Sequence, residues 1–423
     1  MTSLNATVIS IRLIISLFIQ RLLAEMVGEA GIAKIGQLRN LLQLLTSISS
    51  VGIFNGIVKY VAEHKTDEEQ LKKLFSTSFV FITIATVLVV PLLFFGAGFI
   101  SEYLFTTDEF SYVIKILALV VPCIALQRMF NGVINGLSRY KKFAKIDLIA
   151  YLLASGLLVY SLYEYNIGGV LVAIAVTPAI QLVVLLFIFF RTLREYIKFK
   201  ELSFKVPMAK GLLAFTLMSF FSTVLLNYVE IDVRRLITNK ITEDDAGIWT
   251  AMTFISKNYM VFSTAIFSLY VLPKFASIHT ERGFRKEVVS IYRTLLPIFG
   301  LGMILVYLLR DYVILIIYPD FTAMAPLFKW QLLGDFVRLA SVILAHQFLA
   351  KKMVRNFIFT ELLSLALFYG FAHYLTDLYG VEGVVIGHFI RYVIYFLIVA
   401  FLVWRYFRNN KPNELAEETN EEG

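Results

Sequence analysis

Long apolar stretches follow one another along the whole chain and are separated by short polar segments. A helix that crosses the hydrocarbon core of a membrane needs about 20 consecutive, mostly apolar residues. By this measure the sequence predicts twelve spans, at residues 4–27, 37–61, 74–100, 111–136, 146–163, 170–190, 210–233, 247–272, 291–309, 324–349, 357–376 and 384–406. We therefore expect an all-α, polytopic membrane protein.

The composition agrees with this pattern and narrows the class. Hydrophobic residues make up 58% of the 423 positions and charged residues 17%, whereas soluble domains carry about 25% charged residues. The single cysteine, Cys123, leaves no disulfide framework and no Cys/His cluster, so no metal site is predicted. No loop is long enough for a catalytic domain, and we expect a protein that is not an enzyme.

The charges in the loops predict how the chain is oriented. Lys and Arg gather in the cytoplasmic loops of membrane proteins, which also accounts for the net charge of +8. Segments such as "EHKTDEEQLKK" (63–73) and "SRYKKFAK" (138–145) alternate with segments such as "SEYLFTTDEF" (101–110), which contain few Lys and Arg. The first set is predicted to be cytoplasmic, together with both termini.

An internal duplication is visible among the polar and glycine residues. Matches recur at a spacing of 214 positions, in the pairs Lys115 and Lys329, Lys141 and Arg355, Asp147 and Glu361, and Gly156 and Gly370. Several such matches at one spacing indicate two related halves. We expect a six-helix bundle at 1–190, a basic cytoplasmic linker at 191–209, a second six-helix bundle at 210–407 and a disordered acidic tail at 408–423.

The parity of the spans predicts the symmetry of the two halves. Six spans return the chain to the side on which it started, so both halves begin on the cytoplasmic side. The repeat is then parallel, with a pseudo-twofold axis along the membrane normal. Halves of this kind typically enclose a central site and alternate its access by rocking, which indicates a transporter.

Ionisable residues at membrane depth are the candidate functional groups. A charge there is unfavourable by about 2.5–3.5 kcal/mol on insertion scales, so it marks a functional hypothesis. The basic candidates for a substrate-binding cavity are Arg12, Arg21, Lys59, Arg128, Lys257, Arg338 and Arg391. Arg12 and Arg21 are nine residues apart, about 180° around a straight helix. Only one of the two is expected to face the cavity, and the spacing does not say which.

The sign of these charges predicts the substrate class. Arg binds phosphate bidentately, so a basic interior favours an anionic substrate. A cation exporter would instead line its cavity with carboxylates. The remaining candidates are predicted to balance charge or to bind a coupling ion, H⁺ or Na⁺: Asp335, Glu230, Asp232 and His388. No other cofactor is expected.

A repeated tripeptide predicts close helix packing in the first half. Phe54-Asn55-Gly56 recurs at Phe130-Asn131-Gly132. Gly52 with Gly56, and Gly132 with Gly136, have the G-x-x-x-G spacing that lets a neighbouring helix approach closely. Asn55 and Asn131 are expected to hydrogen-bond between helices.

Three motifs carry a resemblance to a known family. "RLLA" at 21–24, "GEAG" at 28–31 and "GIFNGIVKY" at 52–60 are similar to the first two spans of Wzx-type polysaccharide flippases, which include O-antigen translocases and lipid III flippases. The specific likeness covers residues of about 12–64. Beyond them, the chain resembles these proteins in architecture only.

The resemblance implies the multidrug/oligosaccharidyl-lipid/polysaccharide exporter superfamily. Its polysaccharide members move undecaprenyl-pyrophosphate-linked oligosaccharides across the bacterial inner membrane, through a V-shaped, cationic central cavity and with coupling to an ion gradient. The resemblance places basic residues at Arg12, Arg21 and Lys59. Polysaccharide polymerase or assembly proteins would be partners, and no nucleic acid is expected.

Two other functions fit parts of the pattern. A cation or drug antiporter fits the architecture but not the sign of the deep charges. A peptidoglycan-precursor flippase would show fourteen spans where twelve are predicted here.

Overall fold

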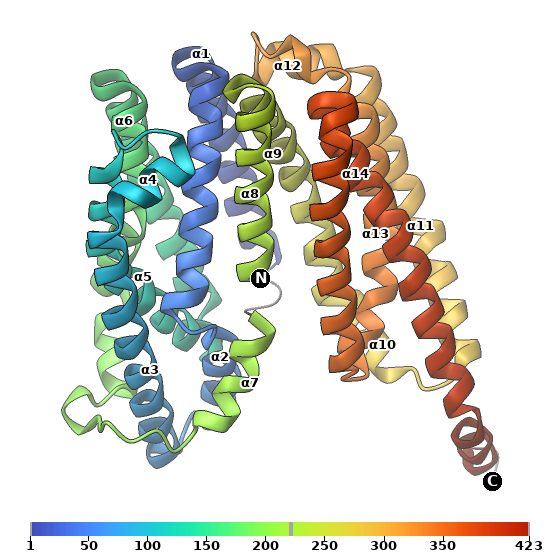
Figure 1. Ribbon diagram of the computed structural model, residues 1–423. Coiled ribbons are helices and arrows are strands. Elements are labelled where there is room, and N and C mark those ends of the chain that lie inside the picture. The colour runs from blue at the N-terminus through green and yellow to red at the C-terminus, as the bar shows by residue number, and fades with distance from the viewer. Residues whose placement is uncertain (1, 220–222, 422–423) are drawn as a thin grey trace. The chain divides into compact units, whose positions relative to one another are not determined.

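A computed structural model describes residues 2–219 and 223–421, and those residues form helices and connecting loops without any strand (Figure 1). The chain divides into two compact units between Asp232 and Val233. That boundary lies within a helix, beyond the expected linker at 191–209, so the boundaries drawn from the sequence stay predictions. Each unit is described by itself below.

The first unit is a bundle of long helices. Its helices are α1 (Thr2–Ser49), α2 (Phe54–Glu63), α3 (Glu68–Phe95), α4 (Ala97–Phe105), α5 (Ser111–Gly136), α6 (Tyr140–Tyr196), α7 (Ala209–Ser219) and the start of α8 (Leu225–Lys240). Buried Leu, Ile, Val and Phe side chains of α2, α3, α5 and α6 form one core. Burial of these apolar side chains holds the helices together.

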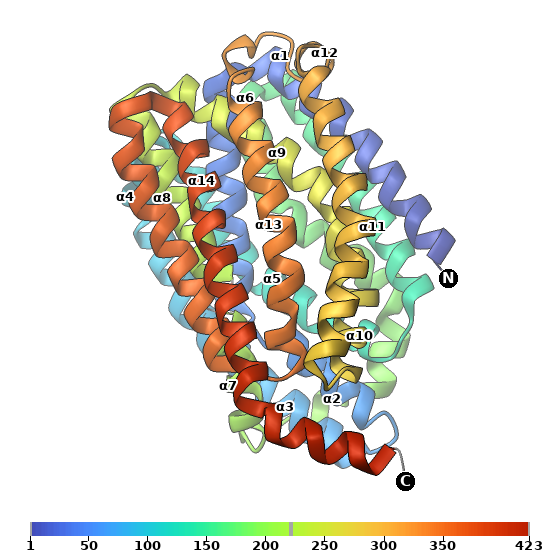
Figure 2. The same cartoon turned by 90° about the vertical axis from the view of Figure 1, so that its right-hand side faces the viewer.

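The second unit contains the rest of α8, α9 (Glu243–Ile266), α10 (Leu272–Ser277), α11 (Glu281–Leu308), α12 (Arg310–Ile317), α13 (Leu327–Ala350) and α14 (Val354–Glu421). A five-residue π-helix, Phe267–Val271, joins α9 to α10. Figure 2 shows α13 between α14 and α11, and a core of aromatic and aliphatic side chains lies among these helices.

Three helices each contain one residue that breaks them into two straight stretches. The breaks lie at Gly28 in α1, Asn166 in α6 and Gly380 in α14, with φ of 65°, 50° and 59°. Asn and Gly tolerate this left-handed region better than other residues. Asn166 and Gly380 are separated by 380 − 166 = 214 positions, the spacing of the repeated residues, which supports the duplication.

The long apolar helices make this an integral membrane protein. Six of the described helices are long and apolar enough to cross a membrane, or seven if the bent pair Ser10–Ser49 and Phe54–Glu63 is one span. Each predicted span falls mostly on helical residues, with short turns at 50–53, 96, 309 and 325–326, and residues 220–222 lie outside the described residues. The 57-residue α6 counts once, although its break separates two predicted spans. The number twelve stays a prediction.

The structure corrects the interpretation of the G-x-x-x-G motif at Gly52. Val51 and Gly52 have φ of 50° and 60° and lie in the turn between α1 and α2, not within a continuous helix. A Cβ on Gly132 or Gly136 of α5 would lie 2.9 Å from Ile57 Cγ2 or 2.7 Å from Val61 Cβ of α2. Close approach therefore depends on the α5 glycines.

The two repeated asparagines make no hydrogen bond to each other. Asn55 is exposed, and Asn131 Oδ1 is buried without a partner among the described residues. The expected bond between helices is therefore not observed, because α2 presents Ile57 and Val61 to α5 instead.

α14 continues to Glu421, and the Glu, Ala and Leu residues of "NELAEETNEE" favour a helix. The disorder expected for the acidic tail at 408–423 stays a prediction.

Candidate functional site

A buried polar network in the second unit joins α9, α13 and α14. Asp335 is 0% exposed, and its carboxylate accepts hydrogen bonds from Ser256 Oγ at 2.5 Å and Gln331 Nε2 at 3.1 Å. The Tyr259 hydroxyl also donates to it, and His388 Nε2 lies 3.1 Å from its Oδ1. Four polar groups from three helices thus converge on one carboxylate, which satisfies its acceptor capacity inside the protein.

The spacing of residues along α13 and α14 produces this convergence. Gln331, Asp335 and Arg338 are four and three residues apart, so they lie on one face of α13. His388 lies on α14 and reaches Asp335 because Gly334 has no side chain. A Cβ at Gly334 would overlap the His388 ring.

The two ring nitrogens of His388 have different neighbours. Nδ1 lies 3.4 Å from Arg391 Nη2, and a guanidinium can only donate. Nδ1 therefore accepts, and the ring hydrogen lies on Nε2, where it points at Asp335. A second proton on His388 would place an N–H against Arg391, so protonation of His388 and its contact with Arg391 exclude each other.

Arg391 is a buried cation, and one of its N–H groups has no hydrogen-bond partner among the described residues. The residue is 5% exposed, and its Nε has no hydrogen-bond partner among the described residues. The guanidinium packs on the rings of Phe368 and Tyr392, with 4.5 and 4.2 Å to their centroids. Arg338 lies on the same Tyr392 ring at 5.7 Å. Cation–π contacts stabilise such cations while leaving N–H groups able to bind an anion.

A second carboxylate completes the group of charges. Glu361 on α14 accepts a hydrogen bond from the Tyr395 hydroxyl at 3.2 Å. With neutral His388, the two carboxylates of Asp335 and Glu361 balance the two guanidiniums of Arg338 and Arg391. Any proton or anion that enters therefore changes a balanced set of charges.

Three of the basic candidates of the first unit form ion pairs that are partly exposed. Arg12 pairs with Asp147 of α6, and their side chains are 40% and 30% exposed. Arg21 pairs with Glu25 at 2.9 Å, and Lys59 with Glu63 at 3.7 Å. Both are pairs four residues apart on one helix, which contribute little to stability.

The remaining candidates are dispersed. Arg128 lies over the Phe54 ring, 4.0 Å from its centroid. Glu230 accepts a hydrogen bond from Asn40 Nδ2 at 2.8 Å, and Asp232, the residue at the unit boundary, is half-buried. Lys257 is exposed on α9. The structure thus brings together Asp335, Arg338, His388 and Arg391.

Four residues around Asp335 are not among the candidates predicted from the sequence: Ser256, Tyr259, Gln331 and Gly334. Ser256 and Tyr259 flank Lys257, and Gln331 precedes Asp335 by one helical turn. Ser256, Tyr259 and Gln331 could have been found from the sequence, because each is a polar residue within one helical turn of a charged residue in an apolar span. Nothing in the sequence indicates that α14 approaches α13 at Gly334.

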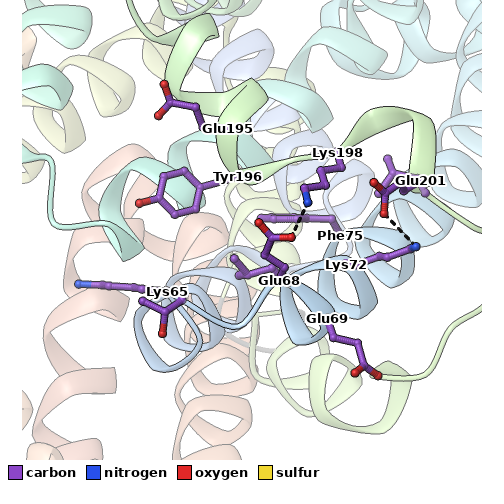
Figure 3. A pocket seen from close by; sticks show the side chains of 12 residues that line it. Lys65, Glu68, Glu69, Lys72, Phe75, Glu195, Tyr196, Lys198 and Glu201 are labelled. Carbon is purple, nitrogen blue, oxygen red and sulfur yellow. Dashed lines mark hydrogen bonds and ion pairs between the residues drawn. The ribbon is translucent and has the colours of Figure 1, made fainter.

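A polar cavity of about 510 Å³ lies at one end of the first unit, between the start of α3 and the end of α6 (Figure 3). Lys198 donates to Glu68, and Lys72 Nζ lies 3.1 Å from Glu201 Oε2. These ion pairs attach the linker after α6 to α3. The hydrogen bond from Lys72 lowers the pKa of the Glu201 carboxyl, and the bond to Glu68 raises the pKa of Lys198.

This cavity does not suit an anionic substrate. Three lysines and four glutamates line it, Lys65, Lys72, Lys198, Glu68, Glu69, Glu195 and Glu201. Carboxylates in this number would repel phosphate. We interpret the cavity as part of the attachment of the linker.

Long apolar helices that enclose a buried polar network around Asp335, His388 and Arg391 are typical of membrane transporters. A multidrug-resistance transporter of the multidrug/oligosaccharidyl-lipid/polysaccharide exporter superfamily, solved facing inward, has the same fold, with a TM-score of 0.75 and 13% identity over 95% of this chain and 98% of that one. A lipid II flippase structure is similar, with a TM-score of 0.74 and 15% identity over 95% of this chain and 87% of that one.

Sequence comparison then assigns the family. The model of the family "Polysaccharide biosynthesis protein" matches residues 2–279, and the chain belongs to this family. It is 30% identical to the lipid III flippase of Escherichia coli K12 over 395 residues, which cover 92% of this chain and 94% of the relative. These relatives are flippases and transporters, and the chain is a transporter and not an enzyme.

Proposed function

We propose that the chain is a flippase that moves an undecaprenyl-pyrophosphate-linked oligosaccharide from the cytoplasmic to the periplasmic leaflet of a bacterial inner membrane by alternating access. The observation that carries this proposal is the 30% identity to a lipid III flippase over 92% of the chain. The substrate would be an O-antigen-type or similar repeat unit. Polysaccharide polymerase or assembly proteins would receive it.

The second unit offers a group suited to the pyrophosphate. Arg391 is buried, carries a donor without a partner and makes no ion pair with a described carboxylate. A phosphate oxygen would satisfy that donor. Arg338, on the same Tyr392 ring, supplies a second positive charge. We propose these two arginines as substrate-binding residues.

The same network supports ion coupling. In this proposal His388 is the group that takes up a proton, because its Nδ1 accepts from Arg391 while neutral. Protonation would break that contact and free Arg391 for the substrate. Asp335 would hold the charged ring through Nε2. Na⁺ bound at the Asp335 carboxylate is the alternative coupling ion.

A cation or drug antiporter on the same fold is the competing function. The likeness to multidrug transporters, at 13% identity, concerns the fold alone. A buried guanidinium with a spare donor favours an anionic over a cationic substrate.

Depletion of the protein in its native host tests the proposal. Undecaprenyl-pyrophosphate-linked saccharide should accumulate on the cytoplasmic leaflet, where it can be measured by its accessibility in inverted vesicles. The wild-type gene should reverse the accumulation, Arg391→Gln should not, and Lys205→Gln, in the exposed linker, should. Loss of dye efflux without any accumulation of lipid-linked saccharide would establish the antiporter instead.

A further inference from the structure

An apolar groove of about 390 Å³ lies between α11 and α13 in the second unit. On α11 it is lined by Gly300, Met303, Ile304 and Tyr307. These residues are three, four and seven positions from the first, so they form one face of the helix. The groove therefore extends along about two turns of α11, or about 10 Å.

The α13 wall has the same spacing. Lys329, Leu332, Leu333 and Phe336 line it. At about 100° per residue, their mean direction lies about 110° around α13 from Asp335, and the nearest of them, Leu332, lies about 60° away. None of the residues that line the groove belongs to the buried polar network. Apart from Lys329 its lining is apolar or aromatic, which suits a hydrocarbon chain.

A glycine permits the close approach of the two helices at the floor of the groove. A Cβ on Gly300 would lie 3.2 Å from Phe336 Cε2, closer than ordinary van der Waals contact. A larger residue at position 300 would therefore either displace Phe336 or fill the groove.

Lys329 lines the groove, and Arg310 follows the lining residue Tyr307 by three positions, so both cations lie where the two helices end. α11 ends at Leu308 and α13 begins at Leu327. Lys329 Nζ lies 4.7 Å from the centroid of the Trp330 ring. Arg310 lies over the Tyr307 ring at 4.8 Å, and its Nε is 3.8 Å from Asp311 Oδ1. Tyr, Trp, Lys and Arg at the end of a span mark the headgroup level of the bilayer.

We propose that this groove binds one acyl chain of an anionic phospholipid, with the lipid phosphate between Lys329 and Arg310. The apolar walls accommodate the chain, and the two cations at headgroup depth favour a negatively charged lipid over a neutral one. A groove about 10 Å long matches part of an acyl chain and is short for a polyprenyl chain. The site is independent of the transported substrate.

The duplication supplies a matched control in the first unit. Lys115, 214 positions before Lys329, lies 6.0 Å from the centroid of the Phe94 ring on α3. The position that corresponds to Gly300 is Thr86, and the one that corresponds to Phe336 is Pro122. Lys115 therefore shares the charge and the interfacial place of Lys329 without the glycine.

Fluorescence quenching by brominated lipids tests the site. Trp249→Phe and Trp404→Phe leave Trp330, beside Lys329, as the one tryptophan of the three. In vesicles, acyl-brominated phosphatidylglycerol should quench Trp330 with a preference over brominated phosphatidylcholine. Removing each cation, with Lys329→Gln or Arg310→Gln, should reduce that preference about fivefold. Lys115→Gln should leave it unchanged.

Two further measurements keep the test decisive. Gly300→Leu should remove the phosphatidylglycerol component of quenching by filling the groove, in protein that elutes as wild type on gel filtration. If the double Trp variant does not fold, native mass spectrometry of the chain with its three tryptophans should show a retained phosphatidylglycerol that Lys329→Gln loses and Lys115→Gln keeps.

Equal quenching by both lipids, or an equal effect of Lys115→Gln, would overturn the proposal. Displacement of phosphatidylglycerol by a low proportion of undecaprenyl phosphate would also overturn it and assign the groove to the lipid carrier.

Discussion

Arg12 in the first unit and Arg391 in the second both lie on long apolar helices, yet their surroundings differ. Arg12 pairs with Asp147, and both side chains are at least 30% exposed. Arg391 is 5% exposed and contacts a histidine and two aromatic rings. The charge of Arg12 is thus neutralised by an ion pair that water can reach. The guanidinium of Arg391 is buried, and its Nε has no hydrogen-bond partner among the described residues.

This difference indicates that the two duplicated halves have different roles. Asp147 and Glu361 occupy equivalent positions, 214 residues apart, but Asp147 pairs with an arginine and Glu361 accepts from a tyrosine hydroxyl. The carboxylate at this position of the repeat thus forms an ion pair in the first unit and accepts a hydrogen bond from a tyrosine in the second. The expected effects of mutation therefore differ between the halves.

Asp335→Ala is expected to have the largest effect. It removes the acceptor on which Ser256, Tyr259, Gln331 and His388 converge and leaves buried cations without their balancing charge. Removing one member of a buried charge pair typically destabilises a protein by about 3–5 kcal/mol. Thermal unfolding in detergent should show a large drop, and transport should be lost.

Asp147→Ala is the control, because it removes the charge in the first unit that pairs with Arg12. It should lower the unfolding temperature much less. Equal losses from the two substitutions would remove the distinction between the units.

His388→Gln should have the next largest effect, on coupling more than on stability. Its amide N–H can still donate to Asp335 in place of Nε2–H, but the side chain cannot take up a proton. Transport into vesicles should then no longer respond to a proton gradient, while the unfolding temperature stays within a few degrees of wild type. His346→Gln, a histidine of α13 that bonds its own helix backbone at Val342, is the control.

A transport rate that still follows the proton gradient in His388→Gln would exclude His388 as the coupling group. A dependence on Na⁺ that disappears in Asp335→Asn would identify the alternative ion.

Features that depend on neighbouring residues in the sequence could be predicted, whereas contacts between residues far apart in the sequence could not. The helices follow from apolar runs of about 20 residues, and the equivalent breaks at Asn166 and Gly380 follow the repeat spacing. The pairing of Asp335 with His388 does not follow, because 53 residues separate them and only the packing of α14 at Gly334 brings them together.

The misplaced glycine motif has a similar cause. Gly52 and Gly56 have the spacing of a packing motif on a continuous helix, but α1 ends at Ser49 and Gly52 lies in the turn before α2, where Val51 and Gly52 have positive φ. Spacing arguments assume an unbroken helix, and a sequence alone does not show where a helix breaks. The glycines of α5 lie in an unbroken helix and do pack against α2.

Arg12→Gln, in the first unit, should have only a small effect on the free energy of unfolding. Partly exposed ion pairs contribute about 0–1 kcal/mol, and Arg12 also packs on the Tyr151 ring, 4.8 Å from its centroid. A double-mutant cycle of Arg12→Gln and Asp147→Asn, measured by unfolding, should give a coupling energy below about 1 kcal/mol. A coupling energy of several kcal/mol would show that this ion pair contributes as much to stability as the buried network does.

The smallest effect is expected at the linker, where the side chains of the Lys72–Glu201 pair are 46% and 49% exposed. Glu201 has a lowered carboxyl pKa because Lys72 donates to it. Its stabilising contribution is therefore present above the unfolded pKa of about 4.3 and is lost as the pH falls through the lower folded value. Proteolysis within the linker should become faster below about pH 4 in wild type, and Glu201→Gln should be cleaved at this faster rate at neutral pH. Glu195→Gln, which lines the same cavity, should behave as wild type. Cleavage that is independent of pH in all three proteins would show that Ser76 and Thr77 of α3, whose hydroxyls accept from the Ser203 and Met208 amides, hold the linker without the ion pairs.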